Sequence, residues 1–395
     1  MAATLLSYMS LPSERHSRSA TLASIAGCRT NAPGNDGKGA VNPAIAKTTV
    51  VTERIGRRKD SLLSSHGVTT ITPPVVWKVT ASIMRLRILI LTFALLACSS
   101  ASDPSSTPPI ETGTAPGSGA TLDRRPFPDD NPWNADISKS AVDPNSATLI
   151  ASCGLRNLHP DFGTVWDGAP NGIPYVVVNS SQTRVPVTFD YADESDPGPY
   201  PIPANAPIEG GSSSSGDRHV LIVDVAAWKL YELFDAHPIN GGASWHAGSG
   251  AVFDLSSNTL RPAGWTSADA AGLPIFPGLV RYDEAVEKHS IQHALRFTCP
   301  RTRRAYLAPA RHYASSDTSS KLPSMGMRVR LRADYDTTGF SPGVRTILRA
   351  MMKYGMLVAD NGSGWFVSGA PDPRWDDSDL ATLARVPSTA FEVVR

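Results

Sequence analysis

The stretch His219-Val-Leu-Ile-Val-Asp-Val225, followed by Ala226-Ala-Trp228 and Lys229-Leu-Tyr-Glu-Leu-Phe234, decides the fold class of this chain. Both outer runs are short, apolar and rich in residues that favour strands. The connection between them is short and rich in Ala. The sequence therefore predicts two strands that pair as a hairpin.

Similar short runs, separated by Pro- and Gly-containing turns, follow on both sides of this hairpin. They predict strands at residues 174–178, 185–190, 250–254, 292–298, 327–333, 356–359 and 365–368. The last two flank Asp360-Asn-Gly-Ser363, a strong turn signal. We expect a mainly β fold, an antiparallel β-sandwich or jelly-roll-like single domain with a few packed helices.

Three helices are predicted around these strands. One follows Asp143-Pro144 and ends before Gly154. The second has Ser341 as its N-cap and ends at Gly355, with an apolar stripe of Val344, Ile347, Leu348 and Met351. The third begins in the acidic run 376–379, because carboxylates favour a helix N-terminus.

The chain divides into four segments by composition. Residues 126–395 are predicted to form the β-rich domain, and residues 99–125 form a Ser/Thr/Pro/Gly-rich tether. Residues 84–98 have a short cationic head and an apolar run, which is typical of an export signal. Residues 1–83 lack sustained periodicity, and we interpret them as a mispredicted start upstream of Met84 or as a disordered extension.

Leu95-Leu-Ala-Cys98 resembles the lipobox of bacterial lipoproteins, in which the cysteine is lipidated. The sequence therefore predicts an extracytoplasmic protein that is anchored to a bacterial membrane or cell surface through Cys98. The alternatives are a plain secretory signal, which would give a secreted protein, and a short buried helix.

Charge and hydropathy exclude two classes of protein. Residues 1–83 carry a net charge of +6, whereas residues 99–395 carry −7. An acidic domain is not expected to bind nucleic acid, because phosphate contacts need a basic surface. No apolar run reaches the roughly 20 residues that span a bilayer, so membrane contact is expected through the lipid only.

The cysteines fit an oxidising compartment. Outside Cys28 and the lipobox, the chain has one pair, Cys153 and Cys299. A disulfide between them is the favoured prediction. Two buried thiols and a nucleophilic cysteine are the alternatives.

An acidic segment offers the one cofactor site that the sequence suggests. Asp190, Asp193, Glu194 and Asp196 lie within seven positions, and carboxylate oxygens are the ligands that Ca²⁺ prefers. The spacing is not that of an EF-hand loop, and a solvated acidic turn is the alternative. No other cofactor is expected.

A second segment favours sugar binding. Flat faces come from Trp245 and Trp265, beside His246, and hydroxyl partners come from Asp254, Asn258 and Asp269. A well-packed irregular loop is the alternative. A serine hydrolase is rejected, because Ala247 and Ala251 replace the glycines of the nucleophile elbow around Ser249.

A third group combines histidine with arginine. His293 or His312 is a candidate general base, with Arg296 or Arg281 to neutralise a substrate carboxylate, as polysaccharide β-elimination requires. If residues 292–298 form a strand, His293 shares a face with Leu295 and Phe297, so a hydrogen-bonded core histidine is the alternative.

Several segments together resemble a widespread family of secreted bacterial hypothetical proteins. They are Asn131-Pro-Trp-Asn134, residues 158–163, 190–203, 208–211, Asp217-Arg-His219, 264–274, 293–298 and 359–377. The resemblance covers nearly all of residues 126–395 and implies no established activity. It does imply that residues 1–83 are foreign to the family pattern.

The leading hypothesis is a protein that acts on an extracellular or envelope polysaccharide, as a glycoside hydrolase or a lyase. For hydrolysis the candidate acid and base are Asp254 and Asp269, whereas elimination would use His293 with Arg296. The alternative is a non-catalytic surface lipoprotein that binds a glycan or another ligand. We expect the protein to act as a monomer.

Overall fold

The computed structural model describes residues 122 and 124–395. Its strands are β1 (His159–Asp161), β2 (Val165–Trp166), β3 (Ala169–Pro170), β4 (Tyr175–Val178), β5 (Val187–Phe189), β6 (Val220–Asp224), β7 (Lys229–Phe234), β8 (His237–Ile239), β9 (Ser244–Ala247), β10 (Ser249–Asp254), β11 (Leu295–Cys299), β12 (Arg328–Leu331), β13 (Met356–Asn361), β14 (Phe366–Ser368) and β15 (Phe391–Val394). The helices are α1 (Ser146–Ser152), α2 (Pro342–Lys353) and α3 (Asp377–Leu380), with short 3-10 turns between elements and one π-turn at Asp283–Glu287. Strand exceeds helix, so the prediction of a mainly β protein is confirmed.

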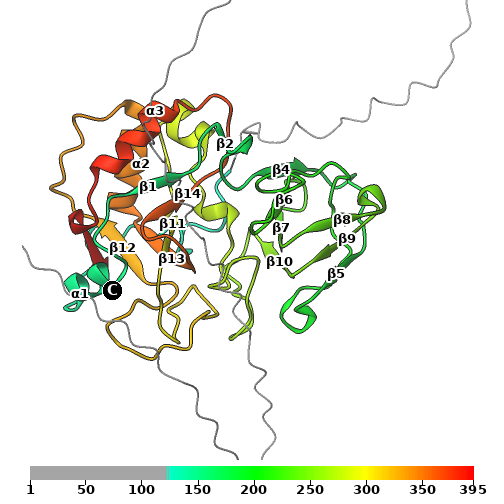
Figure 1. Ribbon diagram of the computed structural model, residues 1–395, viewed down its shortest axis with the longest axis horizontal. Helices are drawn as coiled ribbons and strands as arrows, with labels where there is room; N and C mark the ends of the chain where they lie inside the picture. Colours follow the sequence, from blue (N-terminus) through cyan, green and yellow to red (C-terminus); the bar gives the residue numbers. More distant parts are fainter. Residues whose placement is uncertain (1–121, 123) are drawn as a thin grey trace, which may run out of the picture. The chain divides into compact units, whose positions relative to one another are not determined.

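The largest sheet has the order β1-β14-β11-β13-β12-β15 (Figure 1). It is mixed: β1 runs parallel to β14 and β11 runs parallel to β13, while the other pairs are antiparallel. The turn signal at 360–363 does reverse the chain. However, β11 lies between the strands on either side of it, so β13 and β14 are not hydrogen-bonded to each other.

Two smaller sheets are built around the predicted hairpin. The strands β6 and β7 pair antiparallel from Val220 with Leu233 to Asp224 with Lys229, which confirms that prediction. They form a four-stranded sheet in the order β10-β7-β6-β4, in which β4 runs parallel to β6. A three-stranded sheet has the order β5-β9-β8, and its strands alternate along the chain with those of the four-stranded sheet (Figure 1).

The predicted helices form with the predicted caps. Ser341 accepts a hydrogen bond from the Val344 amide at the start of α2, and Asp376 accepts from the Ser378 and Asp379 amides at the start of α3. Gly355 follows α2 with a φ of 70°, and a Cβ atom there would meet the Val329 carbonyl oxygen. Since both conditions exclude other residues, glycine is required at this position.

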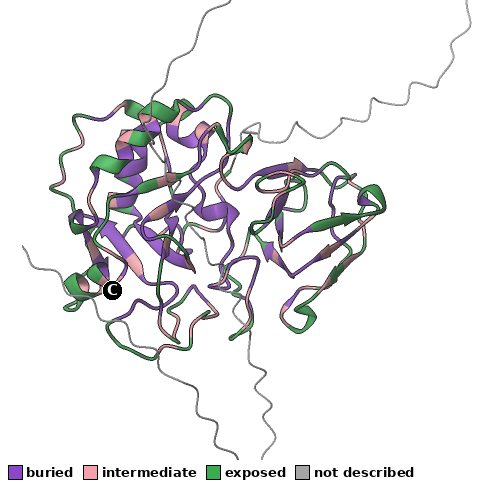
Figure 2. Cartoon of the chain, in the orientation of Figure 1, coloured by how far each residue is buried: buried purple, intermediate pink, exposed green. Residues whose placement is uncertain are grey.

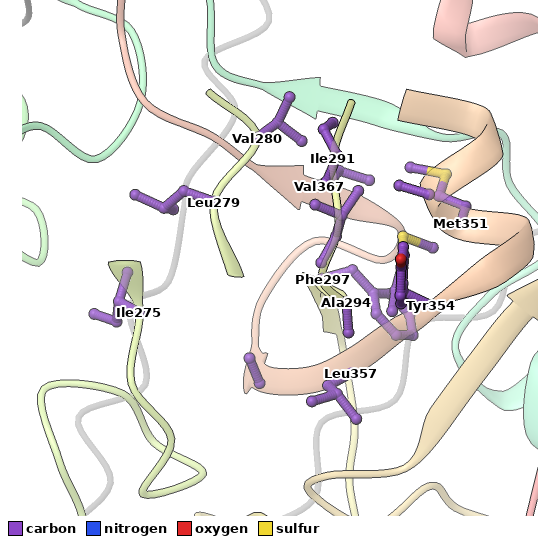
Figure 3. Close-up of a cluster of buried hydrophobic side chains, with 14 of the residues drawn as sticks. Ile275, Leu279, Val280, Ile291, Ala294, Phe297, Met351, Tyr354, Leu357 and Val367 are labelled. Carbon is purple, nitrogen blue, oxygen red and sulfur yellow. The ribbon is translucent and has the colours of Figure 1, made fainter. Parts of the chain in front are cut away.

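The main hydrophobic core lies between α2 and the six-stranded sheet and continues towards the four-stranded sheet. Buried residues follow the strands of all these layers in Figure 2. Figure 3 shows Met351 and Tyr354, from the α2 region, beside Phe297 of β11, Leu357 of β13 and Val367 of β14. No helix among the described residues has the length and hydropathy needed to cross a membrane.

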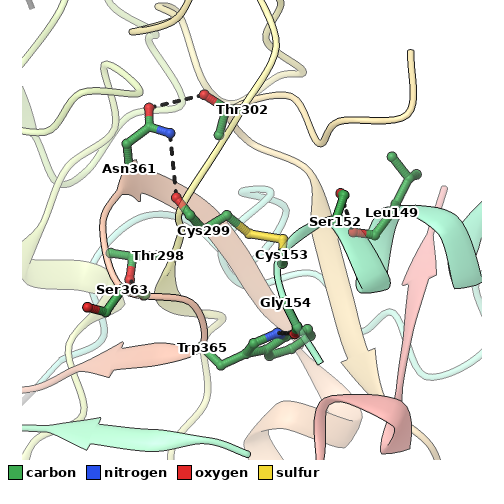
Figure 4. Close-up of a disulfide and its surroundings, with 10 residues drawn as sticks. All are labelled: Leu149, Ser152, Cys153, Gly154, Thr298, Cys299, Thr302, Asn361, Ser363 and Trp365. Atoms are coloured by element: carbon green, nitrogen blue, oxygen red, sulfur yellow. Dashed lines mark hydrogen bonds between the residues drawn. A yellow bond between two sulfur atoms is a disulfide. The ribbon is translucent and has the colours of Figure 1, made fainter. Parts of the chain in front are cut away.

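A disulfide joins Cys153, at the end of α1, to Cys299, at the end of β11, as the sequence predicts (Figure 4). Both cysteines are fully buried. The adjacent Trp365 donates from Nε1 to the Gly154 carbonyl at 2.7 Å. The disulfide therefore ties the first helix to the centre of the large sheet.

We expect the paired substitution Cys153→Ser/Cys299→Ser to lower the free energy of unfolding by about 2–5 kcal/mol. The cysteines are 146 positions apart, and a link across so long a loop restricts the unfolded chain strongly. Urea unfolding followed by tryptophan fluorescence measures the effect. Ser320→Ala, at an exposed position, is the control, and an equal loss there would contradict the expectation.

Candidate functional site

Arg296 lies at one end of a polar row that crosses three strands of the large sheet. Phe297 of β11 is opposite Val367 of β14, which places Arg296 beside Ser368. Ser368 is in turn opposite Asp161 of β1. Since directly opposite residues share a face of a sheet, Asp161, Ser368 and Arg296 lie on the same side. The apolar neighbours Phe297 and Val367 point the other way, into the core.

The Arg296 guanidinium has two partners. It donates from Nη1 to Ser368 Oγ and from Nη2 to Asp269 Oδ1, both at 2.8 Å. Both charged side chains of the Arg296–Asp269 pair are almost completely buried. Two of their atoms, Asp269 Oδ2 and Arg296 Nε, are buried and have no hydrogen-bond partner. Such unpaired polar atoms are costly, and two of the six found among the described residues belong to this pair.

A second ion pair reaches the same region from the four-stranded sheet. His219, just before β6, contacts Glu209 Oε2 through Nδ1 at 2.6 Å and the Ala268 carbonyl through Nε2 at 3.0 Å. Because both partners are acceptors, both ring nitrogens carry hydrogen and the imidazole is positively charged. Ala268 precedes Asp269, so the segment 267–269 joins this pair to Arg296.

Further carboxylates complete what we call the carboxylate cluster: Asp161, Glu209, Asp217, Glu232, Asp269 and Asp360, with the cations His219 and Arg296. The Arg296 charge acts on every one of these acids except Asp217, whose own charge acts on Asp161 and Asp360. Glu232, on β7, is fully buried and accepts hydrogen bonds from the Ile275 and Phe276 amides at 2.9 Å.

In the His219–Glu209 pair, the partner's charge outweighs the effect of burial on each pKa. In the Arg296–Asp269 pair, burial outweighs the partner's charge in its effect on the pKa of Asp269. Burial alone would lower the pKa of His219, but the Glu209 carboxylate raises it to about 9. Burial alone would raise the pKa of Glu209, but the His219 charge holds it below its ordinary value. Burial raises the pKa of Asp269 to about 6 although Arg296 opposes the shift.

Three carboxyl groups outside these pairs, those of Asp161, Glu232 and Asp360, have raised pKa values. Burial, with the charge of Asp269, raises the pKa of Asp360 to about 7. Burial also raises the pKa of Glu232 to about 7. The pKa of Asp161 is raised as well, because the surrounding chain partly desolvates its carboxyl group and the Glu209 charge adds to the effect, although the residue keeps contact with solvent. Asp360 is only half-buried and Asp161 is exposed, so solvent reaches both. The carboxylate cluster can therefore exchange protons with a ligand near neutral pH.

The structure brings two of the predicted residues together away from this cluster. Arg281 and His293 share Glu284, at 2.6 Å and 3.0 Å, and all three side chains are buried. The second ring nitrogen of His293, Nδ1, lies 2.8 Å from the Ala294 carbonyl oxygen. This geometry is that of a hydrogen-bonded core histidine, the alternative left open by the sequence. It does not combine His293 with Arg296, which belongs to the carboxylate cluster.

The acidic segment 190–196 follows β5, and Trp245 lies on β9, so both belong to the region of the three-stranded sheet. Trp245 is 1% exposed and packs inside a hydrophobic cluster. His246 contacts Asp190 at 3.3 Å and Thr188 at 3.0 Å. Asp196 accepts hydrogen bonds from Arg261 and from the Val252 amide. Asp193 lies in the 3-10 turn Ala192–Glu194. Among residues 122 and 124–395 no group of three or more acidic, His or Cys side chains is arranged to hold a metal ion.

The remaining predicted residues are spread along the 254–312 region. Asp254 is exposed and accepts from the Ser256 amide at 2.9 Å. Asn258 donates to Asp130 and accepts from Asn131, both at 2.8 Å, and Trp265 lies under the Arg261 guanidinium. His312 Nδ1 lies 2.8 Å from the Ala270 carbonyl oxygen. The roles proposed for these side chains stay predictions. Cys98 lies outside the described residues.

The sequence interpretation included Asp269 and Arg296 but gave no role to Asp161, Glu209, His219, Glu232 or Asp360. One signal was available: Glu232 interrupts the apolar run Leu230–Leu233, and a carboxylate inside a buried strand needs a partner. The other residues come from loops and strand ends that only the folded chain brings together.

Raised carboxyl pKa values make a specific pH dependence of stability testable. Between about pH 4 and 7 the folded chain binds more protons at Asp269 and Asp360 than the unfolded chain does, so these groups favour unfolding as the pH rises. The stability from His219 is complete below about pH 6.5 and is lost as the pH rises through about 9. We therefore expect the Tm to fall from pH 5 to pH 9. Calorimetry at constant ionic strength measures it, and a rising Tm over this range would contradict the assignment.

No protein-family model, no curated protein and no solved structure matches this chain.

Proposed function

We propose that this protein is an extracytoplasmic glycoside hydrolase whose chemistry is performed by the carboxylate cluster. The observation that carries the proposal is the arrangement of the cluster: Asp161 and Asp360 are open to solvent on the sheet that carries Arg296, whose buried partner is Asp269. The raised pKa of Asp360, about 7, supports it. Glycosidic hydrolysis requires one protonated carboxyl group and one ionised carboxylate at the same bond. A cluster with more acids than cations supplies both forms near neutral pH.

The roles follow from exposure and protonation. Asp360 donates its proton to the glycosidic oxygen while the bond from that oxygen to the anomeric carbon breaks. A water molecule gives hydroxide to the anomeric carbon, and its remaining proton passes to the cluster, where Asp161 is the accessible carboxylate. Arg296 is a positioning residue: it is held by Asp269 and Ser368, and its charge favours the ionised form of Asp161.

Hydrolysis is favoured over elimination by the positions of the two cations. Elimination from a uronate needs an arginine that is free to neutralise the substrate carboxylate, but Arg296 and Arg281 are buried against acids. His293 is enclosed with Glu284 and the Ala294 carbonyl. The hydrolase reading of the sequence therefore has the stronger physical support.

The proposed location outside the cytoplasm rests on two features. The Cys153–Cys299 disulfide is stable in an oxidising compartment. The lipobox-like segment ending at Cys98 supplies the proposed anchor, with the following Ser/Thr/Pro/Gly-rich residues as the tether.

We further propose a sandwich-like arrangement of the two smaller sheets. Val176, Ile222 and Tyr231 of the four-stranded sheet share a hydrophobic cluster with Trp245 and Ala247 of the three-stranded sheet. Shared burial of this kind is what holds two facing sheets together.

The test is incubation of the purified chain with a panel of neutral, acidic and amino-sugar polysaccharides. Reducing ends report hydrolysis, and ultraviolet absorbance reports the unsaturated uronates that elimination forms. New reducing ends without that absorbance support the proposal. Unsaturated products would favour a lyase, and retention of a glycan without any product would favour a binding lipoprotein; either result overturns the hydrolase.

A further inference from the structure

The long connection between β11 and β12 carries a basic segment in an otherwise acidic domain. It is drawn in yellow to gold below the large sheet in Figure 1. Residues 300–321, which we call the basic loop, contain five basic side chains and one acid. Their net charge is +4, whereas residues 99–395 together carry −7. The basic side chains are those of Arg301, Arg303, Arg304, Arg311 and Lys321.

Most of this positive charge is not neutralised by the protein. Of the five basic residues, only Arg301 has an ion-pair partner among residues 122 and 124–395, the Asp317 carboxylate at 2.8 Å. Arg304 donates from Nε to the Tyr313 hydroxyl, and Arg311 donates from Nε to a backbone carbonyl. Arg304 and Lys321 are exposed, so a solvent-borne anion can reach them.

Arg303 is the observation that marks the basic loop as a binding surface. Its side chain is half-buried, its Nε is fully enclosed, and its guanidinium has no hydrogen bond or ion pair within the described part of the chain. A partly desolvated guanidinium without a partner is costly. A carboxylate or phosphate would satisfy it, because the planar fork of arginine donors matches the oxygens of both groups.

Three aromatic rings lie beside Arg304 in the same loop. The rings of His312 and Tyr306 lie 5.7 Å and 6.5 Å from that of Tyr313 and are nearly parallel to it, at 3° and 18°. The Arg304 guanidinium lies 5.5 Å from the centre of the Tyr313 ring. All three rings are half-buried, so part of each is open to solvent. A sugar ring can therefore stack here while its anionic group meets a cation.

Both ends of the β11–β12 connection are tied to β13 beside the proposed proton donor, Asp360. At its start, Thr302 donates to Asn361 Oδ1 at 3.1 Å (Figure 4). At its end, the Gly326 amide donates to the Val358 carbonyl at 2.8 Å. These bonds fix the course of the connection at the end of the strand that carries Asp360.

The middle of the basic loop is tied to the segment that carries Asp269. The amides of Arg311 and His312 donate to the Ala271 carbonyl at 2.8 Å and 3.1 Å, and the Ala271 amide donates to the Ala359 carbonyl at 3.1 Å. The basic loop therefore borders the carboxylate cluster, and its backbone is held in place before any ligand binds. Such preorganisation lowers the entropy lost on binding.

We propose that the basic loop binds an anionic polysaccharide, whose carboxylate or phosphate groups contact Arg303 and Arg304 and one of whose sugar rings stacks on Tyr313. This inference rests on the proposed function and names its substrate class. Because the neighbouring carboxylate cluster is acidic, the anionic group is expected on a sugar next to the one that is cleaved.

A polysaccharide is favoured over a nucleic acid for two reasons. The basic loop directly follows Cys299, whose disulfide is stable in an oxidising compartment. The acidic domain around the loop also opposes a strand that carries a phosphate at every nucleotide.

The test measures binding by calorimetry in EDTA at pH 7, with the Asp360→Asn chain to prevent turnover. Two anionic ligands are each compared with a neutral counterpart: a galacturonic acid hexamer with its methyl ester, and a phosphorylated mannose hexamer with the unphosphorylated one. We expect at least one anionic hexamer to bind about 10-fold or more tightly than its counterpart, and to weaken as NaCl is raised from 20 to 300 mM.

Two results of this test would overturn the inference. One is equal or absent binding of each anionic hexamer and its neutral counterpart. The other is tighter binding of a thymidine hexanucleotide than of both anionic hexamers, which would make the basic loop a nucleic-acid surface.

Arginine variants test the placement. Arg303→Gln/Arg304→Gln is expected to weaken the anionic hexamer about 10-fold and to reduce the salt dependence, without changing the affinity for the neutral counterpart. Arg304→Gln alone should weaken it in the same direction and retain the Tm, because this side chain is exposed. Arg349→Gln removes an exposed arginine from α2 and is the matched control. Affinity in both loop variants equal to that of the control overturns the placement.

Tyrosine variants test the stacking contact. Tyr313→Ala is expected to weaken the anionic hexamer about 3- to 10-fold, whereas Tyr313→Phe, which keeps the ring, should bind within about 2-fold of the parent chain. Comparison of the two Tm values shows whether Tyr313→Ala remains folded. Equal affinity of the folded Ala and Phe variants would exclude the sugar ring from Tyr313.

The outcomes distinguish this inference from the proposed function. Cleavage of neutral polysaccharides by the unmodified chain, without preference for anionic ones, would overturn the substrate class and leave the hydrolase. Preferential binding of an anionic hexamer without cleavage of any anionic polysaccharide by the unmodified chain would support the binding surface and overturn the hydrolase.

Discussion

Asp360→Asn is expected to lower kcat/KM for the hydrolysed glycan by about 10²- to 10⁴-fold, the usual contribution of a general acid. The asparagine side chain has nearly the same shape but no proton to donate to the leaving oxygen. Because burial and Asp269 raise the pKa of Asp360 to about 7, activity of the unmodified chain should also decline as the pH rises above about 7. Initial rates from pH 4 to 9 measure both effects.

The control for this experiment is Asp334→Asn, which removes an exposed carboxylate paired with Arg332. It should retain the activity and the pH profile of the unmodified chain, and circular dichroism should show that both variants fold. Retention of more than about a tenth of kcat/KM by Asp360→Asn would rule out its role as the proton donor. A substrate whose leaving group needs no protonation, such as a glycosyl fluoride, should restore much of the rate.

Arg296→Met is expected to lower the free energy of unfolding by about 3–5 kcal/mol. The substitution removes the one ionic partner that the completely buried Asp269 side chain has among the described residues. It also removes the bond to Ser368 and therefore the link between β11 and β14 through their side chains. Denaturant unfolding measures the loss.

Two further variants serve as controls for Arg296→Met. Arg332→Met removes an exposed arginine that follows β12 of the same sheet and should cost less than about 1 kcal/mol. The double variant Arg296→Met/Asp269→Leu replaces both partners by apolar groups and should recover much of the stability. If Arg296→Met were no less stable than Arg332→Met, the buried pair would not be what stabilises this part of the sheet.

The sequence predicted best those elements that depend on residues close to one another in the chain. The β6–β7 hairpin follows from two apolar runs and a short connection. The boundaries of α2 follow from Ser341 and Gly355, which act through hydrogen bonds and backbone dihedrals within a few residues. The Cys153–Cys299 disulfide was predicted because few pairings were available.

The order of strands was not predictable in the same way. The turn after β13 suggested that β13 and β14 would be neighbours, yet β11 lies between them and pairs with both. A turn fixes the direction in which the chain returns but not which strand fills the adjacent place, because that depends on long-range burial.

By itself the sequence determined the mainly β character of the fold, two helix caps, the β6–β7 hairpin, the disulfide and the acidity of residues 99–395. Each of these depends on residue type and short spacing, which a linear chain displays directly. Only the tertiary structure decided which charged residues share a site. Asp161, Glu209, His219, Asp269, Arg296 and Asp360 come from six separate stretches of the chain, and electrostatic interaction depends on distance in space and on burial. Hence the carboxylate cluster arises from folding, whereas the strands that carry Glu232, Arg296 and Asp360 are already indicated by the sequence and β1, which carries Asp161, is not.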